Sequence, residues 1–322
     1  MQFVAPPTEA VARSRNVERN LMKLMQRPYQ GEDDYWAIRS FLRNLYVRHG
    51  YREMAWPVAR LDYWCCHCVA NLDKGNIEDG IFIWEDECRR IVAVLNREDP
   101  GQVFFQVDPR QRTPELEARL LDVAETHLTT IGTRSGRKAL AVWVTDGDVL
   151  REELLTRHGY ERQEGWQHYD RYRDLALPIP DVQAPDGYTI RSLKLEEIPS
   201  RSWASWRAFH PDEPDTDYQG PDWYRNILTT PLYRRDLDLV AVAEDGSVAA
   251  FCTIWYDDVT RSGYYEPVGT VPEHQRHGLA TALLYEGMRR LRERGAVQAC
   301  LGGGGASNPP AEGVYALSLI HI

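Results

Sequence analysis

Residues 271–280 read Val-Pro-Glu-His-Gln-Arg-His-Gly-Leu-Ala, and the amphipathic run 281–293 follows them directly. An apolar, strand-like segment at 267–271 precedes the turn, so the pattern predicts a strand, a short turn and a helix. Gly278 and Ala280 leave the backbone uncovered where the helix begins, and several N–H groups can point outward together there. Outward N–H groups at a helix N-terminus are suited to bind an anion such as a pyrophosphate.

The spacing Gln-x-x-Gly-x-Ala in this loop resembles the acyl-CoA pyrophosphate loop of the GCN5-related N-acetyltransferases, the GNAT family. The resemblance implies acetyl-CoA as the acyl donor and no metal. It implies that main-chain groups of Gly269 and Val271 pair with the pantetheine arm like an added strand. The residues expected to hold the pyrophosphate are Gln275, Arg276, His277, Gly278, Leu279 and Ala280.

Strands and helices are predicted in the same β-α-β-β-β-α-β order twice, at a spacing of about 160 residues, as a duplicated domain would give. The resemblance therefore extends over nearly the whole chain and implies an α/β fold of two tandem GNAT-like domains. Each domain is expected to be a mixed, mostly antiparallel sheet flanked by helices. The predicted parts are an N-terminal extension (1–23), a degenerate GNAT-like domain (24–177), a linker (178–187) and an acyl-CoA-binding domain (188–322).

The elements expected in the first domain have counterparts in the second. In the first domain they are strands at 25–29, 81–85, 90–95, 103–107, 139–144 and 167–174, with helices at 31–45, 115–128 and 149–157. In the second they are strands at 188–193, 237–243, 248–254, 264–271 and 296–301, with helices at 195–209 and 279–294.

The decisive turn differs between the two domains. Matching Pro109 to Pro272 places Glu115 where Gly278 sits in the second domain. A carboxylate and a nearby proline would block an anion site both sterically and electrostatically. We therefore expect the first domain not to bind acyl-CoA.

Acyl transfer to an amine needs a base, because deprotonating an amine of pKa near 10 costs about 4–5 kcal/mol at neutral pH. By the resemblance, Glu266 lies where GNAT enzymes often hold that base. The Asn-x-x-Ala-x-x-x-Tyr pattern starting at Asn308 places that asparagine near the pantetheine and Tyr315 near the sulfur as the acid. The alternatives are a solvated carboxylate at a strand edge and an ordinary core tyrosine. Alternation along the strand puts Tyr265 on the face opposite Glu266.

Acceptor specificity is expected from residues 209–218, with Trp223 and Tyr224 close by. Carboxylates alternate with aromatic side chains in this segment, a composition that suits a cationic amine, either a small molecule or a peptide. The alternative is a solvated acidic loop. The sequence does not identify the acceptor.

After Tyr315 the family continues into a Gly-Phe turn and two further strands, whereas this sequence reads Ala-Leu-Ser-Leu-Ile-His-Ile over 316–322. Missing strands would leave an exposed sheet edge and an incomplete acceptor wall. The expectation is a second domain that is less stable and less active than one with those strands.

The composition sets broad limits. A net charge of −10 argues against nucleic acid as a partner. No apolar run approaches the roughly 20 residues of a membrane span, and residues 1–24 contain no secretory apolar region. Six scattered cysteines then indicate a reduced, cytoplasmic protein, and the cluster at 65–68 has the spacing of core cysteines rather than of a zinc site. A monomer with an internal pseudo-dimer is expected.

Two functions from different classes remain open. The first is an N-acetyltransferase with one working domain, favoured by the joint presence of Gln275, Gly278, Ala280, Asn308 and Tyr315. The second is a non-catalytic module that senses acyl-CoA or mediates contacts on a GNAT scaffold.

Overall fold

The structure is a computed structural model that describes residues 2–4, 24–49, 55–72, 75–131, 138–163 and 169–302, with the backbone alone at 2–4. The chain forms two compact units. The first comprises Met1–Val58 and Leu72–Gln167, and the second comprises Ala59–Asn71 and His168–Ile322. A short piece of the first half of the sequence thus belongs to the second unit.

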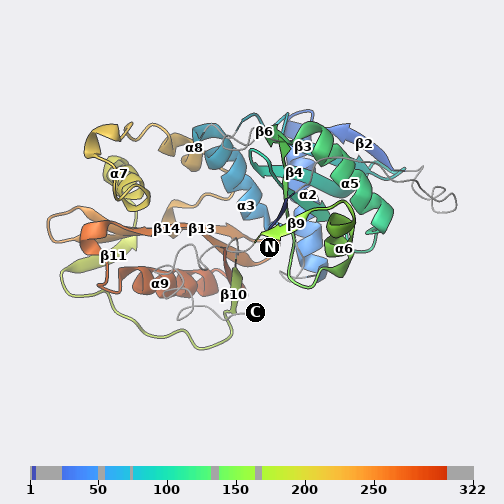
Figure 1. The fold of residues 1–322 in the computed structure, drawn as a ribbon. Helices are drawn as coiled ribbons and strands as arrows, with labels where there is room; N and C mark the ends of the chain where they lie inside the picture. Colours follow the sequence, from blue (N-terminus) through green and yellow to red (C-terminus); the bar gives the residue numbers. More distant parts are fainter. Residues whose placement is uncertain are drawn as a thin grey trace. The chain divides into compact units, whose positions relative to one another are not determined.

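A seven-stranded mixed sheet forms the centre of the first unit, in the order β2-β3-β4-β5-β8-β1-β9 (Figure 1). Only β5 and β8 pair in parallel, and the other neighbours are antiparallel. The strands are β1 (Gln2–Val4), β2 (Met25–Pro28), β3 (Ile81–Glu85), β4 (Ile91–Asp99), β5 (Gln102–Val107), β8 (Ala141–Trp143) and β9 (Glu161–Gln163). A separate two-stranded ladder joins β6 (Thr130–Ile131) to β7 (Lys138–Ala139).

Helices α2 (Glu32–His49), α5 (Pro114–His127) and α6 (Val149–Arg157) complete this unit. All three were predicted, α2 from the acidic residues in its first turn and α5 from apolar residues at helical spacing. The core shows why the pattern in α5 was sufficient. The buried side chains of α5 meet the apolar side chains of β3, β4 and β5 in one cluster that includes Leu116, Leu120, Leu121, Trp84 and Phe105.

One prediction for the first unit is wrong. Residues 2–4, assigned to an extension outside the domain, form β1 and pair antiparallel with both β8 and β9. The run Gln-Phe-Val is too short to stand out as a strand in the sequence. Its neighbours lie about 140–160 residues further along the chain.

The second unit contains a six-stranded sheet in the order β10-β15-β14-β13-β12-β11. All neighbours are antiparallel except β14 and β15, which are parallel. The strands are β10 (Asp170–Asp174), β11 (Tyr188–Ser192), β12 (Asp238–Ala243), β13 (Val248–Asp257), β14 (Ser262–Thr270) and β15 (Gln298–Gly302). The mixed, mostly antiparallel sheets and their flanking helices confirm the predicted fold class.

Strand β10 corrects two further expectations. It was predicted to end the first domain's sheet, but it pairs with β15 from Asp170↔Gly302 to Asp174↔Gln298. The edge of β15 that was expected to be exposed is therefore covered. The sequence of this segment predicts a strand, but it does not predict which sheet the strand joins.

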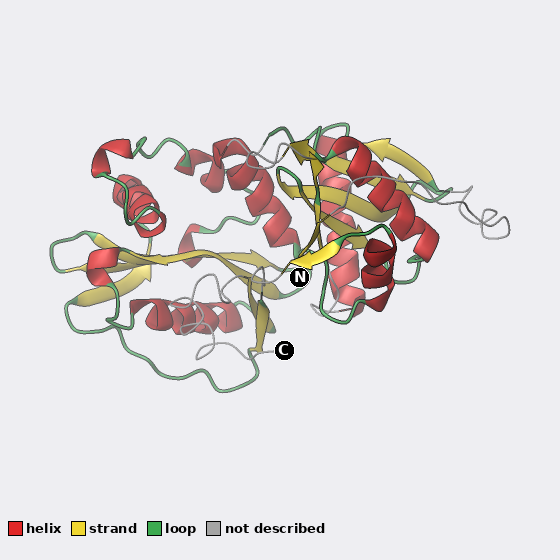
Figure 2. Cartoon of the chain, in the orientation of Figure 1, coloured by secondary structure: helices red, strands yellow, loops and turns green. Residues whose placement is uncertain are grey.

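Helices lie on both faces of this second sheet (Figure 2). Helix α9 (Leu279–Glu293) packs on one face, where its apolar residues join the core of β12, β13 and β14. Helix α7 (Ile198–Phe209) packs on the other face, where Arg201 lies 3.8 Å above the ring of Phe251. The shorter helices of this unit are α3 (Val58–Tyr63), η2 (Trp64–Val69), α4 (Ala70–Leu72), η3 (Leu195–Glu197), η4 (Asp215–Asp217), α8 (Tyr224–Leu228), η5 (Arg235–Leu237) and η6 (Pro272–His274).

The cysteine cluster lies on η2, a single π-helical turn in which Cys65 is buried and Cys66 and Cys68 are half-buried. Within the described ranges, no group of three or more histidine, cysteine or acidic side chains could hold a metal ion. None of the helices in the described part of the chain combines the length and the apolar character needed to cross a bilayer.

Candidate active site

The loop between β14 and α9 has the geometry that its sequence predicts. Its N-cap residue, Gly278, has φ 79° and ψ 5°, a left-handed conformation that glycine adopts without strain. A Cβ atom placed there would meet no atom of the described residues within 4 Å, so these residues leave the position beside Gly278 open. The first intrahelical hydrogen bond runs from Ala282 N to Gly278 O, which leaves the N–H groups of the first turn available to a ligand.

The predicted loop residues divide into side chains that face solvent and side chains that serve the core. Gln275, Arg276 and His277 are exposed, and Arg276 itself has φ 65°. His277 Nδ1 lies 3.2 Å from the carbonyl oxygen of His274, to which it donates. Leu279 is buried in the core, so only its main chain can contact a ligand. Ala280 is half-buried.

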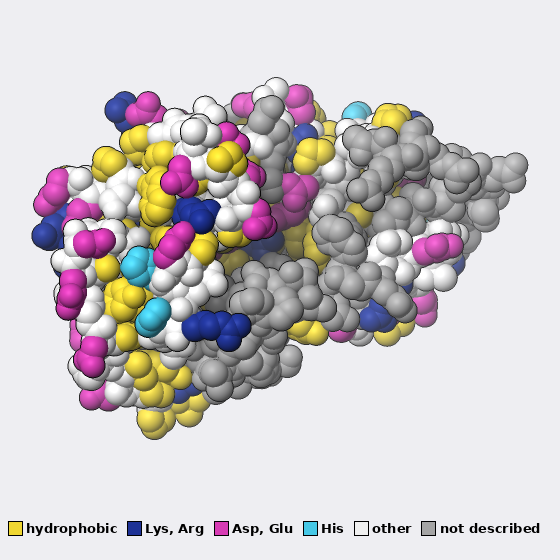
Figure 3. Space-filling model, turned by 60° about the vertical axis from the view of Figure 1, so that its left-hand side comes forward, with side chains coloured by type: hydrophobic (Ala, Val, Ile, Leu, Met, Phe, Trp, Pro, Cys, Tyr) yellow, Lys and Arg dark blue, Asp and Glu magenta, His cyan; other side chains and the backbone are white. Residues whose placement is uncertain are grey.

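Histidine and tyrosine side chains surround this loop. The Tyr188 hydroxyl lies 3.0 Å from His274 Nδ1, and its ring lies 5.8 Å from that of His277. Histidine side chains are open to solvent beside hydrophobic ones on the face of the second unit seen in Figure 3. The loop therefore offers ring nitrogens and one arginine, together with main-chain N–H groups, to an anionic ligand.

Strand β14 separates from β15 after Tyr264, six residues before β14 ends at the loop. The two strands pair only at Ser262, Gly263 and Tyr264, while β14 continues along β13 to Thr270. Among the described strands, none pairs with the other edge of β14 beyond Tyr264. An extended ligand can add to such an edge through main-chain hydrogen bonds.

The two residues predicted to bind the pantetheine arm also have structural contacts. Gly269 lies opposite Phe251, and a Cβ at this glycine would come 2.3 Å from the Phe251 ring, so the close approach requires glycine. Val271 is buried, and its N–H donates to Ala249 O at 2.9 Å. Its carbonyl oxygen accepts from His274 N at 2.9 Å, so the predicted ligand contact would have to use the second lone pair of that oxygen.

Glu266 lies at an irregularity in β14. The β13–β14 register shifts there, so that Glu266 and Pro267 together oppose Thr253. A bulge of this kind re-aims a side chain. Glu266 is half-buried with its Oε2 atom shielded from solvent, and its main-chain oxygen accepts a hydrogen bond from Trp255 Nε1.

The alternation predicted for Tyr265 and Glu266 agrees with the contacts. Tyr265 faces α9, and its hydroxyl donates to Leu284 O at 3.4 Å. On the opposite face, burial raises the pKa of Tyr63 well above its usual range, and the nearby Glu266 carboxylate adds to that rise. Tyr63 therefore remains a neutral phenol near the carboxyl group of Glu266.

Tyr63 belongs to a set of residues that sequence reasoning missed. It comes from α3, and the adjoining η2 and α4 contribute His67 and Asn71 to the same unit. The sequence signal was an aromatic-rich amphipathic stretch, which indicates burial but names no partner. Nothing in its spacing connects it to residues about 150–200 positions later.

The predicted acceptor segment 209–218 is exposed except at His210 and Tyr218, which are half-buried, whereas the two neighbouring aromatic residues are less open to solvent. Phe209 is 55% exposed, whereas Tyr224 is buried with its hydroxyl donating to the carboxylate of Asp238. Asp238 also accepts hydrogen bonds from Tyr233 and Thr253, and its Oδ1 lies 3.6 Å from Arg201 Nε. Tyr224 therefore supports the buried network under the site, whereas Trp223 and Tyr218 are half-exposed.

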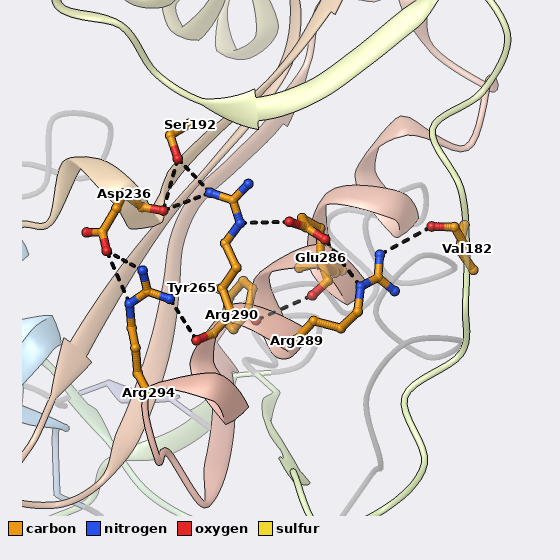
Figure 4. A network of polar contacts seen from close by, with 9 residues as sticks. Val182, Ser192, Asp236, Tyr265, Glu286, Arg289, Arg290 and Arg294 are labelled. Carbon is orange, nitrogen blue, oxygen red and sulfur yellow. Dashed lines mark hydrogen bonds and ion pairs between the residues drawn. The ribbon is translucent and has the colours of Figure 1, made fainter.

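Helix α9 is fixed at the end remote from the loop, as Figure 4 shows. Arg290 donates to Ser192 Oγ at 2.6 Å and to the main-chain oxygen of Asp236 at 2.9 Å. Arg294 forms an ion pair with the Asp236 carboxylate. These contacts tie the helix to β11 and η5, so its first turn can stay open without loss of position.

Asn308 and Tyr315, predicted to contact the pantetheine and to act as the acid, lie outside the described residues. Their roles stay predictions.

Comparison with known proteins gives one family. The model of the acetyltransferase (GNAT) family matches residues 195–318. A mycothiol acetyltransferase from Paenarthrobacter aurescens (strain TC1) is 26% identical over 231 residues, which cover 66% of this chain and 64% of that protein. The matched region thus spans less than two thirds of the relative's length.

Two solved structures share the fold over nearly the whole chain. A GCN5-related N-acetyltransferase from Sphaerobacter thermophilus has a TM-score of 0.59 at 18% identity, covering 92% of this chain and 93% of its own. A tandem GNAT protein from the clavulanic acid biosynthesis pathway has a TM-score of 0.56 at 17% identity, covering 93% and 95%. At these identities the likeness concerns the fold.

Proposed function

We propose that the second unit, in which the GNAT acetyltransferase model matches residues 195–318, transfers an acetyl group from acetyl-CoA to a primary amine. One observation carries the proposal. Three features follow one another in order: the uncapped start of α9, the edge of β14 that has separated from β15, and the bulge at Glu266. Acetyl-CoA presents a pyrophosphate, an extended arm and a thioester in the same order.

The chain's own groups suit such a donor. The first-turn N–H groups of α9 and the Arg276 side chain would hold the pyrophosphate. Main-chain groups of β14 between Glu266 and Thr270 would pair with the arm. The open space in front of Gly278 supports this fit, because nothing in the described chain occupies it.

The reaction is a direct displacement. The amine nitrogen attacks the thioester carbonyl carbon, the C–N bond forms, and the C–S bond breaks to release CoA. Glu266 accepts the proton that the amine loses, directly or through water, and its partial burial keeps it near the reacting atoms. The leaving sulfur takes a proton from an acid, the role proposed for Tyr315.

Calorimetric titration with acetyl-CoA tests the donor site. The variant Gly278→Glu places a carboxylate and a side chain where the pyrophosphate would lie, and binding should be lost. Gly295→Glu is the matched control, because Gly295 has φ 82° and open space at the other end of the same helix. Equal affinity in both variants would contradict the assignment of the loop.

Turnover of a panel of primary amines tests the reaction itself. The variant Glu266→Gln should bind acetyl-CoA normally but lose roughly 100-fold or more in kcat, the contribution typical of a general base. Acetyl-CoA binding without turnover of any amine would support the non-catalytic acyl-CoA-sensing function. Absence of binding in the wild type would overturn both functions.

A further inference from the structure

We propose that residues 59–71, from the first half of the chain, form the acceptor-binding wall of the site in the second unit, with His67 and Trp223 contacting the amine. The inference rests on the proposed acetyl transfer and adds the side from which the acceptor enters. It also adds the chemistry that recognises the acceptor: a cationic amine held against aromatic faces beside a carboxylate.

Hydrogen bonds attach this segment to the second unit. Asn226 Nδ2 donates to Asn71 Oδ1 at 2.6 Å, and Asn71 Nδ2 donates to the main-chain oxygen of Trp223 at 3.2 Å. Both asparagines are half-buried. The end of the segment is thus fixed to α8, next to the half-exposed aromatic of the predicted acceptor region.

The same asparagine fixes the imidazole of His67. Because Asn71 Oδ1 already accepts a hydrogen bond, its Nδ2 faces His67 Nδ1 at 3.0 Å as a donor. His67 Nδ1 is then the acceptor, and the neutral ring carries its proton on Nε2. A ring held in one tautomer and one orientation is suited to recognise a ligand.

Aromatic rings extend from this imidazole to the proposed base. The His67 ring lies 5.1 Å from that of Trp223 and 4.9 Å from that of Tyr63. Tyr63 lies 5.8 Å from the ring of Trp255, whose indole N–H binds the main chain of Glu266. The half-buried end of this row, at His67 and Trp223, is accessible, while the Tyr63 end is buried.

The position of the row on the sheet determines its role. Glu266 and Tyr63 lie on the face opposite α9, as the contacts of Tyr265 show. An amine bound at the half-exposed end of the row, at His67 and Trp223, lies on the same face of the sheet as Glu266. Ring faces attract an ammonium group, and the neutral phenol of Tyr63 adds no competing charge. The carboxylate at the end of the row then receives the proton.

Steady-state kinetics on the full chain tests the wall, with spermidine, L-lysine, cysteamine and alanyl-glycine as the amine probes. For the amine turned over best, His67→Leu and Trp223→Leu should each raise the amine KM roughly tenfold, as expected for loss of an aromatic contact to a cation. The acetyl-CoA KM should stay within about twofold. His67→Phe, which keeps a ring, should restore most of the amine affinity.

The variant His158→Leu is the control, because His158 is an exposed histidine of the first unit. Hydrogen exchange gives a second measurement, in which peptides covering 61–71 should gain protection when the amine is added to the acetyl-CoA-bound wild type. Unchanged amine KM in both leucine variants, or protection elsewhere but not in 61–71, would overturn this inference alone. Failure of the wild type to turn over any probe would count against acetyl transfer as well.

Discussion

Helix α5 of the first unit and helix α9 of the second both follow a strand through a short turn, but different residues build their first turns. In α5 the N-cap is Thr113, whose hydroxyl accepts from Leu116 N at 3.2 Å, and Pro114 follows it. In α9 the N-cap is Gly278, which has no side chain. At the start of α5 a side chain of the protein itself binds a main-chain N–H group. At the start of α9 no side chain caps the helix, so its main-chain N–H groups can bind a ligand.

Charge separates the two turns as well. Arg112 contacts the carboxylates of Glu117 and Asp148, and Glu117 also accepts two hydrogen bonds from the buried Arg151. The cations near the start of α5 are thus neutralised internally. Arg276 at the start of α9 is exposed. A cation that is paired within the chain is less available to an anionic ligand than an exposed arginine, in agreement with the prediction that the first unit does not bind acyl-CoA.

The equivalence between the turns also corrects the sequence match. Matching the prolines placed Glu115 opposite Gly278, whereas the structural equivalent is Thr113. Five residues separate β5 from the N-cap of α5, and seven separate β14 from that of α9. The shorter turn moves Glu115 into the first turn of the helix, where a carboxylate is favourable.

The largest effect is expected at the buried ion pairs of the first unit. Glu117→Gln removes the closest charge partner of the buried Arg151 and leaves its longer, 4.0 Å pair with Asp148, so the free energy of unfolding should fall by about 3–5 kcal/mol in denaturant titration. Burial raises the pKa of Glu117, but Arg151 and Arg112 outweigh burial and lower it. The stabilisation is therefore complete above the unfolded pKa of about 4.3 and declines as the pH falls through the folded value.

The matched control for this change is Glu115→Gln, on a half-buried carboxylate two positions earlier in the same helix. It should change the unfolding free energy by less than about 0.5 kcal/mol. Similar losses in both variants would show that the start of α5 is not held together by the Arg112–Glu117–Arg151 ion pairs.

A threonine N-cap at the start of α9, like the one at the start of α5, should give the next largest effect. Gly278→Thr should weaken acetyl-CoA binding roughly 100-fold in calorimetry, comparable to the loss of a charged hydrogen bond. It should also reduce stability by about 1–2 kcal/mol, because threonine is strained at this φ. Gly295→Thr should reproduce the loss of stability without the loss of affinity.

Removing the side-chain cap at the start of α5 should have a smaller effect. Thr113→Ala removes the capping hydroxyl and should lower the unfolding free energy by about 1 kcal/mol. Thr126→Ala, on an exposed threonine near the other end of α5, should be nearly neutral. The first unit should gain no acetyl-CoA binding, and a second binding site in the titration would show that the cap alone excludes the ligand.

The smallest effect concerns the far end of α9, which is fixed while its start is open. Asp236→Asn should cost about 0.5 kcal/mol, because the Asp236 side chain is 45% exposed. Burial raises its pKa and Arg294 more than offsets this, so the pKa is lowered overall. The difference from wild type should shrink as the pH falls below about 3.9. Asp222→Asn, in an exposed pair with Arg225, is the control, and an equal loss there would contradict a specific anchor.

Local patterns predicted those parts of the molecule that depend on neighbours in sequence. The loop before α9, the hairpin of β12 and β13 and the helices α2, α5 and α9 all follow from periodicity and turn residues. The pairing of β10 with β15 and the placement of 59–71 could not be predicted in this way. Their partners lie more than 100 residues away, and an amphipathic pattern specifies burial without specifying the surface that supplies it.

The pairing of β10 with β15 has a consequence for synthesis on the ribosome. Residues 170–174 emerge more than 120 residues before the strand that they pair with. Until β15 is made, β10 has an unpaired edge, and exposed edges are open to aggregation. Fragments cut at 178–187 would separate β10 from its partner. A fragment intended to carry the second unit would have to begin before Asp170 and would still lack 59–71.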